Sequence, residues 1–366
     1  MENVNSNSPI SSITPDKPTV PASIKNISKK IIIWSVVVIA IAVSGWFGYK
    51  KFTNTNTNTA RLYPGKIIIG YVIWPGYLGL YIASDKGYFK DAGLDVEVRA
   101  YPSLTEEYND FNAGTAQGAA ILTLDSVNAA YNGLDHKIVV AIDYSNGSDG
   151  IISNSDIKKI ADVKGKRVAF EHGTLEEFFL RYALDHNYVD FNDIKAIDLN
   201  PEKSAEAFVR GEADVAVTYE PFMSKALRER VGQKIYSSHD APGLITDTLA
   251  FRSDFIDKYP ETIDAVIKAY FQAIDFWKNN PQEANIIISK YLGVNVAEVS
   301  PQVQGVTILD REDNRTAFTF AAGLESLYGN MRSIGDFVVA HSKNKNQKTI
   351  DTDSLIDPIF IRKILK

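Results

Sequence analysis

Residues 137–150 read KIVVAIDYSNGSDG, an apolar run followed directly by a cluster of Asn, Gly, Ser and Asp. The first part is short and rich in β-branched residues, which predicts a buried strand. The second part, YSNGSDG at 144–150, holds more turn-forming residues than an ordinary bend needs, and it lies far from both chain ends. This stretch therefore predicts a place where the chain leaves one folded lobe and enters another.

A second turn-rich stretch, SHDAPG at 238–243, predicts the return crossing. A chain that leaves the first lobe, builds the second and comes back makes two crossings. Gly147, Gly150 and Gly243 lie in these stretches and can absorb the backbone rotation that a hinge needs. A cleft between two lobes joined by such a hinge is a place to trap a small molecule.

Strand-like and helical patterns alternate on both sides of the first crossing. The predicted strands cover residues 66–72, 95–101 and 118–123 before it, and 166–173, 193–199 and 214–221 after it. Residues 244–366 begin with a strand-like run and continue as long helical segments, whose apolar residues we interpret as core rather than as ligand contacts. This alternation predicts an α/β fold of two lobes, each with a parallel or mixed sheet covered by helices.

Composition limits the classes of function. The chain has 366 residues, 45% of them hydrophobic, which is enough for two lobes with cores. It has no cysteine, which excludes structural disulfides, thiolate zinc sites, cysteine nucleophiles and a lipid anchor on cysteine. The net charge of −6 is uneven, because residues 1–60 carry +4 and the rest carries −10. An acidic globular part argues against binding to nucleic acid or to anionic lipid surfaces.

The common catalytic and metal-site motifs are missing from the sequence. Its five His residues form neither an HExxH motif nor a pair four residues apart, and there is no P-loop and no GxSxG motif. We therefore predict a binding protein and not an enzyme, with no cofactor and no metal ion.

Residues 31–49 read IIIWSVVVIAIAVSGWFGY and carry no charge, so as a helix they roughly span a hydrocarbon core of about 30 Å. Lysine pairs flank the segment, and aromatic residues near its ends suit the membrane interfaces. We predict an uncleaved, single-pass transmembrane anchor. The alternative is a cleaved signal peptide, with Ala40 and Ala42 as the small residues of the cleavage site.

The composition around this segment completes the predicted domain order. The residues before it are polar, and the Thr-Asn repeat after it has no hydrophobic period, which predicts a flexible tether. The predicted parts are a disordered tail (1–30), the anchor (31–49), the tether (50–63), a first lobe (64–146 and 244–366) and a second lobe (147–243).

Four segments, in this order, resemble the extracytoplasmic solute-binding proteins of the nitrate/sulfonate/taurine class of ABC importers. They are GYVIWPGYLGLYIASDKGYFKDAGLDVEV (70–98), ADVKGKRVAFEHGT (161–174), AFVRGEADVAVTYEPF (207–222) and TIDTDSLIDPIFI (349–361). The resemblance implies a two-lobed, periplasmic-binding-protein-like fold of type II with two hinge crossings and a small-molecule ligand in the cleft. It also implies delivery of that ligand to a membrane permease driven by a cytoplasmic ATPase.

The same resemblance implies that the binding domain lies outside the cytoplasm. Members of the class commonly carry a lipid-modified cysteine or are cleaved free, whereas this chain departs from them and is expected to be held at the cell membrane through residues 31–49. Two alternatives stay open. The pyrimidine synthases of thiamine biosynthesis are enzymes that share the fold. Their family is expected to carry a cysteine-rich motif, and this chain has no cysteine. A sensory ectodomain would need a separate receptor, because the chain has no C-terminal signalling module.

Ligands of α/β sheets lie beyond the carboxyl ends of the strands, near helix N-termini. The side chains expected there follow the predicted strands or lie at the crossings, and the strand-end loops contain no Arg or Lys. The predicted ligand contacts are Trp74, Tyr77, Thr123, Asp125, Asn146, Asp149, Glu171, Gly173, Thr174, Tyr219, Glu220 and Asp247.

The charge of these residues favours a ligand with a cationic nitrogen. Thr123, Ser126, Gly173 and Thr174 offer neutral donors to a sulfonate or carboxylate. However, carboxylates desolvated beside an anion are unfavourable without a compensating cation. We expect a zwitterion such as taurine, or a compact cation such as a guanidinium or an amine. The alternative for each single acid is a structural role, such as a helix cap or a turn.

Overall fold

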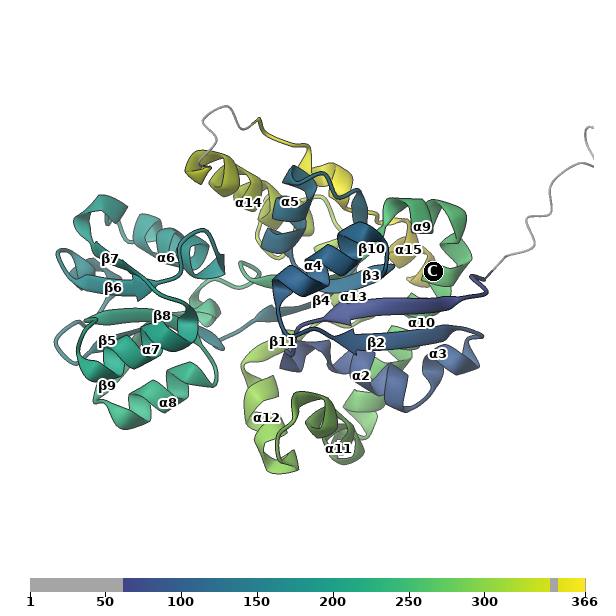
Figure 1. Ribbon diagram of the computed structural model, residues 1–366, viewed down its shortest axis with the longest axis horizontal. Coiled ribbons are helices and arrows are strands. Elements are labelled where there is room, and N and C mark those ends of the chain that lie inside the picture. The colour runs from purple at the N-terminus through teal and green to yellow at the C-terminus, as the bar shows by residue number, and fades with distance from the viewer. Residues whose placement is uncertain (1–61, 343–347, 366) are drawn as a thin grey trace, which may run out of the picture. The chain divides into compact units, whose positions relative to one another are not determined.

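The computed structural model describes residues 62–342 and 348–365, and its strands form two sheets (Figure 1). The six-stranded sheet has the order β11 (Val306–Ile308), β4 (His136–Ser145), β10 (Thr246–Arg252), β3 (Gly118–Leu122), β1 (Lys66–Tyr71) and β2 (Asp95–Ala100). The five-stranded sheet has the order β7 (Lys195–Asp198), β6 (Arg167–Phe170), β8 (Val215–Tyr219), β5 (Asp149–Asn154) and β9 (Gly232–Ser237). The six strands predicted around the first crossing are confirmed as β1, β2, β3, β6, β7 and β8.

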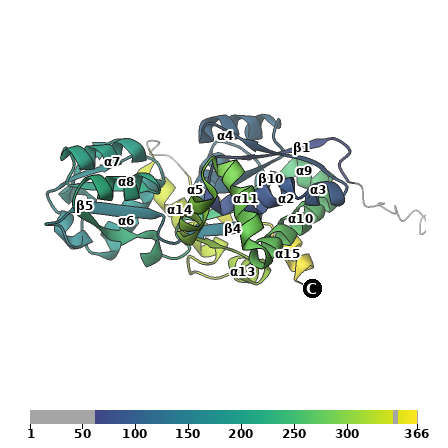
Figure 2. The ribbon, with the colours of Figure 1, turned by 90° about the horizontal axis from the view of Figure 1, so that it is seen from below.

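Helices lie against both sheets. Those of the first lobe are α2 (Leu78–Asp85), α3 (Tyr88–Asp91), α4 (Leu104–Ala113), α5 (Thr123–Tyr131), α9 (Ser253–Lys258), α10 (Pro260–Asn279), α11 (Pro281–Leu292), α12 (Val296–Gln304), α13 (Arg311–Ala317), α14 (Leu327–His341) and α15 (Ile359–Ile364). The second lobe has α6 (Leu175–His186), α7 (Pro201–Arg210) and α8 (Phe222–Glu229). Figures 1 and 2 show α6 on one face of the second sheet and α7 with α8 on the other. Short 3-10 helices are η1 (Pro75–Tyr77), η2 (Ile160–Val163), η3 (Phe191–Asp193), η4 (Ser238–Asp240) and η5 (Thr352–Leu355).

Both sheets combine parallel and antiparallel pairs, and the crossings explain why. In the first sheet β1 runs parallel to β2 and β3, and in the second β6 runs parallel to β7 and β8. The chain passes from β4 into β5 at the first crossing and from β9 into β10 at the second. β5 and β10 are the strands that pair antiparallel with β8 and β3, respectively. Each crossing therefore inserts one antiparallel strand beside the parallel ones.

The two crossings are bonded to each other. Ser238 accepts a hydrogen bond from the backbone N–H of Gly147 at 2.7 Å, and its hydroxyl lies 2.7 Å from that of Ser145. Gly147 and Gly243 have φ values of 110° and 78°, which side-chain-bearing residues rarely adopt. Gly150 does not share this property, because it lies inside β5 and pairs with Thr218. The turn chemistry of the first crossing is therefore confined to the residues between β4 and β5.

The apolar run at 137–142 lies in the core of the first lobe, within β4. Residues 138–142 of β4 are all fully buried, as a strand between two neighbours in a sheet should be. In α10, Ile263, Val266, Tyr270 and Ile274 are also fully buried. This burial confirms that the helical pattern of the C-terminal region marks core packing.

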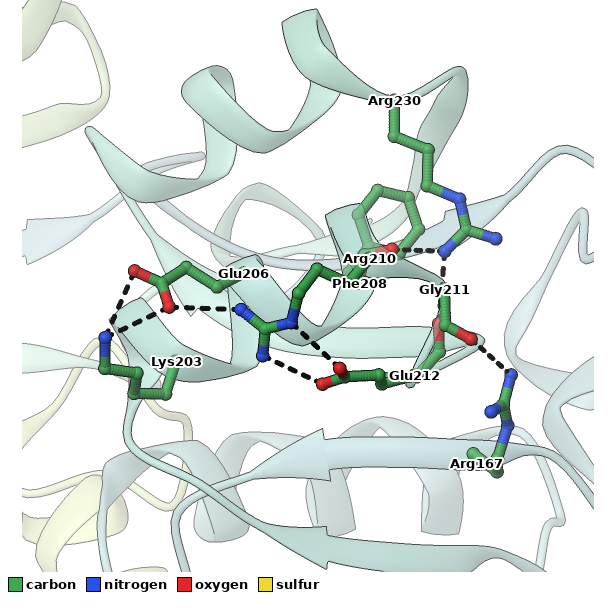
Figure 3. Close-up of polar contacts among 9 residues, drawn as sticks. Arg167, Lys203, Glu206, Phe208, Arg210, Gly211, Glu212 and Arg230 are labelled. Carbon is green, nitrogen blue, oxygen red and sulfur yellow. Dashed lines mark hydrogen bonds and ion pairs between the residues drawn. The ribbon is translucent and has the colours of Figure 1, made fainter.

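Arginine side chains hold the C-terminal end of α7 (Figure 3). The helix ends at Gly211, whose φ is 73°. Arg167 of β6 donates a hydrogen bond to the carbonyl oxygen of Gly211 at 2.8 Å, and Arg230, which follows α8, donates to the carbonyl oxygens of Phe208 and Ala213. Since the last carbonyls of a helix have no partner within it, these bonds join β6, α7 and α8.

Replacing Arg230 with Ala is expected to lower the free energy of unfolding by about 1–3 kcal/mol, through lost hydrogen bonds and lost packing. Its guanidinium group also lies over the ring of Phe208, 4.6 Å from the centroid. Arg210→Ala is the control, because Arg210 makes exposed ion pairs with Glu206 and Glu212, which contribute little to stability (Figure 3). Urea unfolding of both variants measures the difference, and equal losses would contradict this assignment.

Within residues 62–342 and 348–365, none of the helices has both the length and the apolar character needed to cross a membrane. The predicted tail at 1–30, the predicted anchor at 31–49 and almost all of the predicted tether at 50–63 lie outside the described residues.

Candidate functional site

A cavity of about 310 Å³ lies where parallel strands of both sheets reach their carboxyl ends. The first lobe contributes Val72, Ile73, Trp74 and Tyr77 after β1, Leu104 at the start of α4, Leu122, Leu124, Asp125 and Asn128 at the end of β3 and in α5, Ile245 just before β10, and Asp247 in β10. The second lobe contributes Asp149 at the start of β5, Glu171 and residues 173–176 after β6, Pro201 after β7, and Tyr219 of β8. Strand ends and helix starts from both lobes thus converge on one space, as the fold predicts.

Nine of the twelve predicted contact residues line this cavity. They are Trp74, Tyr77, Asp125, Asp149, Glu171, Gly173, Thr174, Tyr219 and Asp247. The other three lie elsewhere. Thr123 is buried in the first turn of α5, and Asn146 donates to the hydroxyl of Thr307 at 3.0 Å and lies 2.6 Å from His239. Glu220 accepts hydrogen bonds from Ser224 at the start of α8. Ligand contact by the nine residues stays a prediction.

Sequence reasoning missed Glu176, Asn128 and an apolar part of the wall. Glu176 lies in the first turn of α6 and is 7% exposed, so its position just after a strand-end loop was a usable signal. The apolar wall includes Ile73 and Leu104, which are 55% and 46% exposed. The sequence does not identify such residues, because an apolar residue near a strand end is normally interpreted as part of the hydrophobic core.

Five of the lining residues carry a carboxyl group: Asp125, Asp149, Glu171, Glu176 and Asp247. No Lys, Arg or His is among the lining residues described. Tyr77 donates a hydrogen bond to Asp247 at 2.5 Å, whereas one oxygen of Asp125 and one of Asp149 have no partner within the described residues. In the same part of the chain, no group of three or more His, Cys, Asp or Glu is placed to hold a metal ion.

Burial changes the acidity of this group of carboxyls. It raises the pKa of Asp125 to about 7 and that of Asp149 to about 7, and the charge of Glu176 adds to both effects. It likewise raises the pKa of Asp247 to about 7, with Asp125 and Asp149 as additional causes. Burial also raises the pKa of Glu176 itself. These four carboxylates are therefore costly to keep charged without a counter-ion, and the cost falls when a cation enters the cavity.

A sixth carboxyl group, that of Asp143, lies next to Asp247 but does not line the cavity. Asp143 of β4 is opposite Asp247 of β10 in the strand register, and it is fully buried. The indole N–H of Trp74 donates to Asp143 at 3.2 Å, and a Cβ added to Gly76 would lie 2.1 Å from the other carboxyl oxygen. Burial, together with the charge of Asp247, raises the pKa of Asp143 well above its usual range. Sequence reasoning missed Asp143 because it directly follows the apolar run.

In the second lobe, two groups just before α6 and the first turns of α7 and α8 are bonded by side-chain acceptors of the chain itself. Glu177 accepts from the backbone N–H of Gly173 at 2.8 Å, and Glu176 accepts from the hydroxyl of Thr174 at 2.5 Å. The first turn of α7 donates to Asn200, and the first turn of α8 donates to Glu220.

These bonds lower the number of predicted neutral donors that are free to bind an anion. Gly173 and Thr174 are bonded to carboxylates, and Ser126 is fully buried with its hydroxyl 2.7 Å from a ring nitrogen of His136. Of the side chains that line the cavity, the Tyr219 hydroxyl and the Asn128 amide are donors without a hydrogen bond in the described residues. The side chains of the cavity therefore present mainly acceptors.

Residues 74–284, more than half of the chain, match the family described as NMT1/THI5 like. A putative binding protein of Brucella abortus is 26% identical over 63% of this chain and 73% of its own length. A putative aliphatic sulfonates-binding protein of Bacillus subtilis is 23% identical over 78% of this chain and 85% of its own length. Among solved structures, the periplasmic aliphatic sulphonate binding protein SsuA of Escherichia coli has a TM-score of 0.67 at 18% identity, covering 82% of this chain and 100% of its own. This likeness confirms the predicted α/β, periplasmic-binding-protein-like fold with two sheets.

Proposed function

Since the chain belongs to the NMT1/THI5 like family, we propose that it is the solute-binding component of an ABC importer of the nitrate, sulfonate and taurine class. Its partners are a small-molecule ligand, a membrane permease and a cytoplasmic ATPase. The binding domain lies outside the cytoplasm, tethered to the cell membrane through residues 31–49. Relatives of the chain are named as binding proteins, in agreement with a role that is not enzymatic.

The ligand carries a cationic nitrogen. This part of the proposal depends on one observation: a cavity with five carboxyl groups and no basic side chain among its described lining residues. Buried charges are normally paired, and two of these carboxyls each have an oxygen without a partner in the described residues. A bound ammonium or guanidinium group would supply the missing donors and the missing positive charge together.

Binding couples the two lobes. The carboxyl groups come from both sides of the crossings, Asp125 and Asp247 from the first lobe and Asp149, Glu171 and Glu176 from the second. A cation that bonds to both sets binds most tightly when the lobes approach each other, so it shifts the population toward the closed form. Gly147 and Gly243, with their positive φ values, supply the backbone freedom for that motion.

The charge requirement can be tested with three molecules that share an ethyl skeleton: ethylammonium, taurine and ethanesulfonate. In isothermal titration calorimetry with the full chain, we expect ethylammonium to bind and ethanesulfonate to give no signal. Taurine should bind more weakly than ethylammonium, because its sulfonate meets few free side-chain donors and several carboxyl groups. Binding of ethanesulfonate with no binding of ethylammonium would contradict the proposed ligand charge and leave the importer class standing.

A further inference from the structure

A second cavity, of about 230 Å³, borders the main one in the first lobe. The two share Leu104, Asp125 and Asn128 in their walls. Beyond Asp125, the walls of this side chamber are largely apolar and include Phe111 and Ile121. It is thus a hydrophobic extension whose entrance carries a carboxyl group.

The side chamber contains one more acidic residue, Glu107 of α4. Its side chain is 1% exposed, and neither of its carboxyl oxygens has a hydrogen-bond partner within the described residues. The side chain lies against β1, where a Cβ added to Gly70 would be 3.2 Å from its Oε1. A buried carboxyl group with both oxygens unpaired is rare in folded proteins and needs a cause.

We propose that the side chamber is a second subsite, which takes the far amino group of an elongated ligand with two basic nitrogens joined by an apolar chain. This inference rests on the proposed function, because the first nitrogen occupies the carboxyl-lined cavity. The apolar walls suit a methylene chain, Asp125 lies where the two cavities meet, and Glu107 meets the second nitrogen. A diamine or an amine with a guanidinium group has this shape and charge.

Charge balance in the side chamber agrees with this arrangement. Burial, together with the nearby Asp125 and Asp247, raises the pKa of Glu107 to about 9. In the ligand-free protein the chamber therefore holds a neutral carboxylic acid at neutral pH. When an ammonium group enters, the carboxyl proton passes to solvent, and the resulting carboxylate accepts hydrogen bonds from the bound nitrogen.

The test compares α,ω-diaminoalkanes with monoaminoalkanes of the same chain length, by isothermal titration calorimetry on the full chain. We expect the best diamine to bind about tenfold more tightly than the matched monoamine, since one added charge-assisted hydrogen bond is worth about that factor. In Glu107→Gln this ratio should fall to near unity. Asp110→Asn, which removes a carboxylate from the outer side of the same helix, should keep the tenfold ratio.

Measurements on the native protein alone test whether the second subsite exists, even if the variants do not fold. Equal affinities for diamines and monoamines at every chain length would overturn the second subsite while leaving the proposed cationic ligand intact. Binding of neither series would overturn both. A tenfold preference that survives Glu107→Gln would overturn the assignment of Glu107.

Discussion

Replacing Asp149 with Asn is expected to weaken the binding of ethylammonium by about a hundredfold, because removing one partner of a buried charge pair costs about 2–5 kcal/mol and each 1.4 kcal/mol is about a factor of ten. Asp149 is 7% exposed in the cavity wall, and its Oδ2 has no partner in the described residues. The same change should raise the melting temperature of the ligand-free protein, because an amide of the same shape carries no charge to desolvate. The binding role and the stability role of this carboxylate therefore have opposite signs.

Glu220→Gln is the matched control for this prediction. Glu220 was also predicted to contact ligand, but its carboxylate caps α8 through Ser224 and does not line the cavity. We expect its affinity for ethylammonium to stay within about twofold of the native value, and its stability to fall by about 0.5–2 kcal/mol through the weakened cap. Calorimetry and thermal unfolding give both quantities. An Asp149→Asn variant with native affinity, or with a lower melting temperature at pH 8, would contradict the role assigned to Asp149.

The ligand-free protein is expected to be more stable at pH 5 than at pH 8. In the folded chain the pKa of Asp125, Asp149 and Asp247 is raised to about 7, while an unfolded Asp titrates near 3.8. Between these values the folded state binds more protons than the unfolded state. The stability that these groups contribute is complete below the unfolded pKa and is lost as the pH rises to about 7. A tenfold difference in proton affinity between the two states is worth about 1.4 kcal/mol, so each of these Asp residues contributes at most about 4 kcal/mol.

Ligand binding should show the opposite dependence on pH. A cation needs the carboxylates in their charged form, so the affinity for ethylammonium should rise as the pH increases from 5 to 8. Urea unfolding across this range, with and without the ligand, gives the two slopes. Glu107 should extend the loss of stability of the free protein to higher pH, because its pKa is raised to about 9. A stability of the free protein that rises between pH 5 and pH 8 would contradict the burial of these charges.

Much of the fold could be predicted from the sequence, because its signals are local. Short β-rich runs separated by helical stretches located the strands of both sheets, and four segments in order pointed to the correct family. The first crossing was found from its turn residues, although Gly150 proved to be part of β5. The membrane segment at 31–49 lies outside the described residues and stays a prediction.

The acidic site could be predicted only in part, because its remaining members depend on tertiary packing. The carboxyl ends of parallel strands meet at one edge of a sheet, so residues such as Asp125 and Tyr219 could be placed from topology alone. Glu107 could not, because it lies in a polar helix and is buried by tertiary packing, with β1 close to it at Gly70. Asp143 faces Asp247 only through the pairing of β4 with β10, two strands far apart in the sequence.

The central claim is that a cationic nitrogen binds among the carboxyl groups of the cavity between the two lobes. A crystal structure of the protein with the tightest-binding amine of the tested series examines it most directly. We expect the amine nitrogen to lie within hydrogen-bonding distance of carboxyl oxygens from both lobes, Asp149 among them. An amine bound outside the cavity, or bound inside it with its nitrogen turned away from every carboxyl group, would contradict the account.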